Sequence, residues 1–97
     1  RSTEVAEALY DMNEKSITIE NQYLFQMWFV LCERALKESY PFKNIKAIAS
    51  AVEYMFYSTI NSKKVTKKHY AQKYNISVAT LTKYVEESIQ FLPFDSK

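Results

Sequence analysis

Lysines and small polar residues are concentrated in the segment 63–83, where they have the chemistry of nucleic-acid contacts. Lysine ammonium groups bind phosphate oxygens, whereas hydroxyl and methyl groups on a helix contact the edges of bases. The phosphate candidates are Lys63, Lys64, Lys67, Lys68 and Lys73. The base-edge candidates are Ser77, Ala79, Thr80, Thr82 and Lys83. Because only Lys83 among these carries a charge for guanine acceptors, we expect modest sequence specificity.

Two short helices joined by a tight turn are predicted to position these side chains. Thr66 is placed to cap the first helix, which turns Tyr70 and Ala71 inward. Asn75 falls where the turn needs a left-handed backbone, which asparagine tolerates. Ile76 then enters the core, and Ser77 caps a second helix whose inward positions follow helical spacing: Val78, Leu81, Val85, Ile89 and Leu92. This order predicts a helix-turn-helix over 66–92, a motif whose second helix fits the DNA major groove.

The positive charge is concentrated around the same motif. Residues 1–42 carry four cations and seven anions, a net charge of −3, whereas residues 43–85 carry eight cations and only Glu53, a net charge of +7. Residues 86–97 have a net charge of −2. Such a basic segment attracts phosphate through counterion release whatever the base sequence.

Residues with catalytic potential are few and far apart in the sequence. The single cysteine, Cys32, excludes a disulfide within the chain and falls on an apolar helix face, where a small buried hydrophobe is expected. The single histidine, His69, lies in the basic segment, where we expect it to be solvated. No HExxH motif, paired carboxylates, glycine-rich phosphate loop or nucleophile–base pair is present. We therefore predict neither an enzyme nor a metal or cofactor site.

Length and composition predict one all-α domain over residues 1–97. The chain has no glycine and 2 prolines, which leaves few tight turns for a β-sheet fold. Its 47% hydrophobic residues argue against disorder. No run of about 18 apolar residues exists, so no membrane contact is expected. Because the chain starts at Arg1, we expect a piece of a longer protein. The lone cysteine fits a cytoplasmic setting, or a nuclear one in a eukaryote.

Five helices are predicted, at about 3–15, 19–39, 44–59, 66–74 and 77–92. Apolar residues run nearly all round the second helix, which predicts that it is the central, most buried one. Thr18 is expected to cap it. Exposed aromatic residues, for which the candidates are Tyr40, Tyr57, Tyr74 and Phe94, are expected to mark an interface.

The segment 44–92 resembles the second half of a cyclin-box repeat of the kind found in general transcription factor B. The resemblance is carried by Ile48-Ala49, Ala51, Tyr54 and Ser58, then by Thr66 and Tyr70-Ala71, then by Ile76-Ser77, Thr80-Leu81 and Tyr84. It implies a five-helix cyclin-like bundle around a buried third helix. It also implies that the last two helices contact promoter DNA and that other faces bind partner proteins. The fifth helix has Lys83 but no arginine, and a metal-binding ribbon and a second repeat are missing, so a regulatory or accessory protein is expected.

Two functions stay open at the level of sequence. In the first, the chain binds double-stranded DNA in transcription regulation, with other transcription proteins or a twin subunit as further partners. In the second, it is a cyclin-box-like protein–protein interaction module without DNA binding, because cyclins of the same fold bind proteins only. The two differ in whether the start of the fifth helix is open to solvent.

Overall fold

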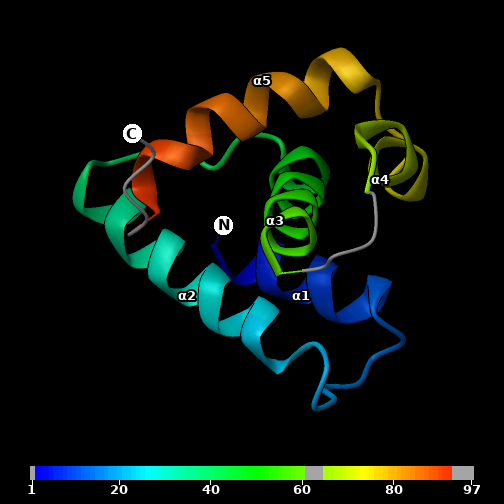
Figure 1. Cartoon of the computed structure of the whole chain (residues 1–97). Helices are drawn as coiled ribbons and strands as arrows, with labels where there is room; N and C mark the ends of the chain where they lie inside the picture. The colour runs from blue at the N-terminus through cyan, green and yellow to red at the C-terminus, as the bar shows by residue number, and fades with distance from the viewer. Residues whose placement is uncertain (1, 61–64, 93–97) are drawn as a thin grey trace.

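The computed structural model describes residues 2–60 and 65–92, which form five α-helices and no strand. The helices are α1 (Ser2–Met12), α2 (Gln22–Lys37), α3 (Ile45–Ile60), α4 (Lys67–Lys73) and α5 (Val78–Ser88), with a short 3₁₀ turn, η1 (Ile89–Phe91), after the last. Figure 1 shows α3 near the middle of the view, with the other helices around it. The all-α prediction is confirmed. Within the described part of the chain, no helix is long and apolar enough to cross a membrane.

The third helix packs against each of the other four helices. Its residues 47–53 are all buried, and small side chains at Ala47, Ala49, Ser50 and Ala51 let neighbouring helices approach closely. The prediction that α2 is the most buried helix is therefore wrong. Leu24, Trp28, Leu31 and Ala35 of α2 face the core, whereas its opposite face is open to solvent.

The connection between α1 and α2 is longer than predicted. Glu14 and Lys15 take left-handed backbone angles, with φ of 62° and 53°, which ends α1 early. Thr18 and Asn21 then bond reciprocally: each side-chain oxygen accepts from the other residue's backbone N–H, at 2.6 and 3.1 Å. Because Thr18 takes part in this turn and does not cap the helix, α2 begins at Gln22, three residues after the predicted start.

An aromatic cluster holds the end of α2 against η1. Ser39 has a φ of 56°, and the chain then turns back through Tyr40 and Phe42. The Phe42 ring meets Trp28 edge-on at 5.7 Å, and the Tyr40 ring meets Phe91 at 5.3 Å. The Tyr40 hydroxyl also donates to Glu87 Oε1 at 2.7 Å, which ties this cluster to the end of α5.

The last two helices, α4 and α5, have the caps that the sequence predicts. Thr66 Oγ1 accepts from the backbone N–H of His69, and Ser77 Oγ accepts from that of Thr80, at 3.1 and 3.0 Å. Asn75 has a φ of 57°, as the turn was predicted to require. Two predicted inward positions are wrong: Val78 and Ile89 are exposed, because the core contacts run through Leu81 and Leu92 instead.

Candidate nucleic-acid interface

The first two turns of α5 pack on α3 with one face and leave another face open to solvent. Ser77, Ala79 and Lys83 are exposed, and Thr80 and Thr82 are half-buried. Val78, expected to point inward, is 43% exposed and joins them. We call Ser77, Val78, Ala79, Thr82 and Lys83 the recognition face. Leu81, with no exposed area, anchors this part of α5 from the other side.

The sequence did not predict that Val78 is exposed, because its spacing to Leu81 and Val85 fits one helical face. It is the first residue of α5, directly after the Ser77 cap. The first turn of α5 is therefore exposed although its apolar spacing matches that of the buried Leu81. Position relative to the cap was the signal available in the sequence.

The Ser77 and Thr80 side chains are bonded to each other. Ser77 Oγ donates to Thr80 Oγ1 at 2.9 Å while it accepts from the Thr80 backbone N–H. This pair fixes the first turn of α5 and leaves lone pairs on both hydroxyl oxygens for an incoming donor.

The fourth helix, which carries Lys67 and Lys68, packs against α5 near the point where α5 begins (Figure 1). Lys68 is exposed. Lys67 is half-buried, with its Nζ 6.0 Å from the centre of the Tyr54 ring, and Lys83 Nζ lies 5.6 Å from the Tyr84 ring centre. Aromatic rings attract ammonium groups over their faces, which restrains these side chains without neutralising them. Lys63 and Lys64 lie outside the described residues.

Lys73, one of the predicted phosphate contacts, forms an ion pair with a buried carboxylate. Its Nζ lies 2.6 Å from Oε1 of Glu53, a residue of α3 with no exposed area. The same carboxylate accepts hydrogen bonds from the Tyr74 hydroxyl and from Asn13 Nδ2, the latter at 3.1 Å. One buried carboxylate therefore joins α3 to α4 and to the end of α1. Charge alone could not distinguish Lys73 from the exposed lysines.

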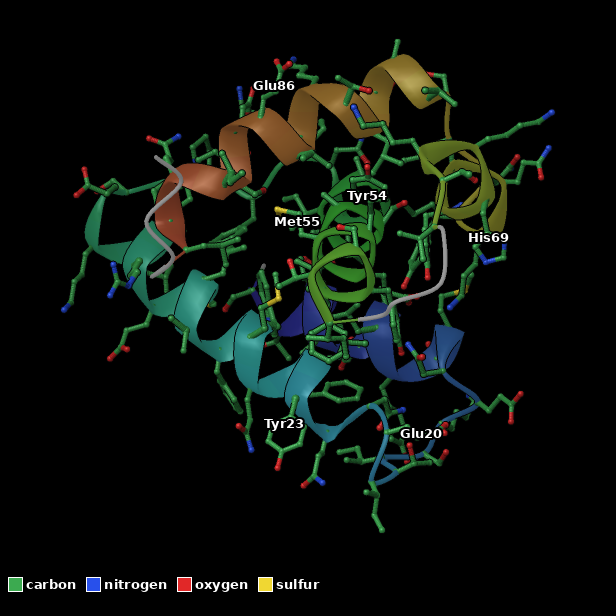
Figure 2. The ribbon with its side chains drawn as sticks, viewed as in Figure 1. Glu20, Tyr23, Tyr54, Met55, His69 and Glu86 are labelled. Carbon is green, nitrogen blue, oxygen red and sulfur yellow. The ribbon has the colours of Figure 1, made fainter. Side chains whose placement is uncertain are left out.

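Stacked rings fix α4 on α3. Tyr70 is buried, its ring stacks on that of Tyr57 at 6.0 Å, and Ser50 Oγ donates to its carbonyl at 3.0 Å. Burial, followed by the charge of Glu53, raises the pKa of Tyr70 to about 12. His69 is exposed on α4 with its ring edge-on to Tyr70 (Figure 2). Of the aromatic residues predicted to be exposed, Tyr74 is buried, so this prediction is wrong for it, whereas Tyr40 and Tyr57 are half-buried; Phe94 lies outside the described residues.

The chain matches no family model, no curated protein and no solved structure. The family resemblance therefore stays a proposal, and the interface is defined by its own geometry.

Acidic residues follow the recognition face along α5. Glu86 is exposed and points outward from the helix (Figure 2), and Glu87 follows it, bonded to Tyr40. The recognition face therefore ends two turns after the Ser77 cap. Among the described residues, no group of three or more His, Cys, Asp or Glu side chains could hold a metal ion.

Proposed function

We propose that the chain binds double-stranded DNA through the recognition face of α5, as a helix-turn-helix domain in transcription regulation. The observation that carries the proposal is the exposure of this face on a helix that packs against α4, which carries Lys67 and Lys68. A recognition helix must project from its domain to enter the major groove, and its first turns meet the base edges.

The proposed contacts divide by chemistry. Lys67 and Lys68 hold phosphates on the flank of the groove. On the recognition face, the Val78 and Ala79 methyl groups meet thymine methyls, and Lys83 reaches guanine acceptors or a phosphate. The side chains of this face are short, so most of the affinity comes from the phosphates and falls with salt.

We retain the cyclin-like arrangement, with α3 at its centre, and a regulatory or accessory role in the cytoplasm or nucleus as parts of this proposal. A binding role without catalysis is also proposed. This part of the proposal is supported by Glu53, a buried acidic residue with a structural role. Its carboxylate binds Lys73, Tyr74 and Asn13 and so holds helices together inside the protein.

The test is a fluorescence-anisotropy titration of mixed-sequence duplex DNA at several salt concentrations. We expect binding at about 50 mM salt that weakens steeply with added salt. Replacing Lys67 and Lys68 by Gln should lower the log–log salt slope by about two. The matched control replaces Arg34 and Lys37 on α2 by Gln, which removes the same charge from another surface and should leave the slope unchanged.

The second candidate is a protein–protein interaction module without DNA binding, and the exposed apolar face of α2 favours it. A folded sample that binds no duplex at about 50 mM salt would select this candidate. If the Lys67/Lys68 and Arg34/Lys37 changes lowered duplex affinity equally, this result would also contradict binding through α5.

A further inference from the structure

The outer face of α2 is apolar although no other part of the described chain covers it. Tyr23, Phe29, Val30 and Leu36 are 57, 72, 36 and 55% exposed. Phe29, Val30 and Leu36 also line a surface hollow of about 380 Å³, together with Cys32 and Glu33. A cluster of large apolar side chains on an exposed surface is typical of a site that another molecule covers. Apolar residues lie on both sides of α2, on the outer side together with Gln26, Glu33 and Lys37, and the fold covers only the inner side.

The spacing on this face is symmetric about the midpoint between Phe29 and Val30. Tyr23 and Leu36 lie equally far from that midpoint, as do Gln26 and Glu33, and as do Gln22 and Lys37. An antiparallel pair of α2 helices related by a two-fold axis there would place Tyr23 against the partner copy's Leu36, and the Phe29 and Val30 side chains at the centre. Self-complementarity of this kind is what a two-fold homodimer requires of its interface.

The charges on the face favour the antiparallel pair. In that arrangement Gln26 faces a second copy's Glu33, so an amide can donate to the carboxylate, and Gln22 faces Lys37. A parallel pair would instead set Glu33 against Glu33 and Lys37 against Lys37. Like charges that face each other across an interface are unfavourable. None of the antiparallel contacts pairs like charges, so the antiparallel arrangement avoids this cost.

The available area fits a weak, specific dimer. Sixteen residues make α2 about 24 Å long, and its two exposed aromatic side chains bury on the order of 100 Å² each when covered. With Val30, Leu36 and the polar flanks of both copies, the total comes to about 1,000 Å², the lower end of specific interfaces.

We propose that the outer face of α2 is a homodimer interface, formed by a second copy of this chain packed antiparallel about Phe29 and Val30. The proposal does not depend on DNA binding. Figure 1 shows α2 and the start of α5 on opposite sides of α3, so pairing through α2 leaves both recognition faces open.

The first experiment is sedimentation velocity of the 97-residue chain at about 100 μM, where a micromolar dimer is populated. We expect twice the 11.4 kDa mass of the chain. Phe29→Glu acts in both copies, so the dimer Kd should rise at least about 100-fold. Ile89→Glu, which places the same charge at a 47% exposed apolar residue of η1, away from the outer face of α2, should leave the dimer intact. A monomeric wild-type chain, or equal dissociation by both variants, would overturn the proposal.

The second experiment tests the direction of pairing by oxidation in a Cys32→Ser background. Gln26→Cys with Glu33→Cys should form a disulfide-linked dimer, since the antiparallel pair brings these positions together. The two sites lie seven residues apart on one helix, about 10 Å, too far for a disulfide within one chain. Glu33→Cys alone should stay monomeric on a non-reducing gel. Equal cross-linking of the single variant would indicate a parallel pair and contradict the proposal, whatever the effect of Phe29→Glu on folding.

Discussion

Lys73 Nζ lies 2.6 Å from Glu53 Oε1, and this contact joins α4 to the core helix α3. Glu53 has no exposed area, whereas the Lys73 side chain keeps 27% of its own. A buried carboxylate is costly unless it is paired and hydrogen-bonded, and here Tyr74 and Asn13 complete its partners. The orientation of α4, and through it of α5, therefore rests on a polar interaction inside the protein.

Removing the lysine should leave Glu53 buried without a cation. We expect Lys73→Met to lower the free energy of unfolding by about 2–3 kcal/mol, less than for a fully buried pair because Lys73 is partly exposed. Adding Glu53→Gln should recover part of this loss, because the orphaned charge is removed. Urea denaturation measures both, with Lys68→Met, an exposed site, expected to stay within about 0.5 kcal/mol of the wild type. Equal effects of Lys73→Met and Lys68→Met would contradict the role given to the ion pair.

Tyr74 should make the protein sensitive to alkaline pH. Burial, then the charge of Glu53 and the hydrogen bond to it, raise the pKa of the Tyr74 phenol above its ordinary value of 10.0. Its contribution is complete below pH 10 and is lost as the pH rises, since the unfolded chain releases the phenol proton first. Tyr74→Phe should cost about 1 kcal/mol at neutral pH. It should also flatten the fall in unfolding free energy above pH 10 by up to about 1.4 kcal/mol per pH unit. Unfolding curves at pH 7 and at several values above pH 10 measure this, and an unchanged slope would contradict it.

The caps of α4 and α5 and the turn between them were predictable because their signals are local. Thr66, Asn75 and Ser77 each act on backbone groups within three residues, so residue type and order suffice to place the caps and the turn. The end of α1 was less predictable, since Glu14 and Lys15 have no strong preference for left-handed angles.

Long-range contacts could not be predicted in the same way. The pairing of Lys73 with Glu53 spans 20 residues, and the sequence shows only one more lysine in a basic segment. The burial of α2 was overestimated for a related reason. The apolar pattern of α2 predicts that Phe29, Val30 and Leu36 are covered. It does not show whether the covering residues belong to the same chain.

The Asn75 position should prefer glycine over any residue with a longer side chain. At a φ of 57°, a Cβ costs about 1 kcal/mol, and asparagine is among the residues that bear it best. We expect Asn75→Gly to be neutral or stabilising and Asn75→Ala to lower the free energy of unfolding by about 1 kcal/mol. Thermal and urea unfolding of the two variants provide the comparison. A more stable alanine variant would show that the left-handed turn does not form.

Ser77 has two roles that substitutions can separate. Ser77→Ala removes the cap on the Thr80 N–H and should cost about 1 kcal/mol of unfolding free energy. Ser77→Asp keeps a capping oxygen and should leave stability within about 0.5 kcal/mol, yet its negative charge should weaken duplex binding. Thr66→Ala is the control, because it removes the α4 cap at a similar cost without touching the recognition face. If Ser77→Asp binds duplex as well as the wild type, the start of α5 does not approach phosphates.

Glu86 offers a test in the direction of increased affinity. It is exposed on α5, beyond the recognition face, where a bound duplex would pass close to a carboxylate. Glu86→Lys should therefore raise duplex affinity and steepen the log–log salt slope, since it replaces a repulsive charge with a phosphate contact. Glu7→Lys on α1 changes the net charge equally at another exposed site and should have a much smaller effect. Anisotropy titrations of both variants at matched salt decide the point: equal gains would mean that overall charge, and not the position of α5, governs binding.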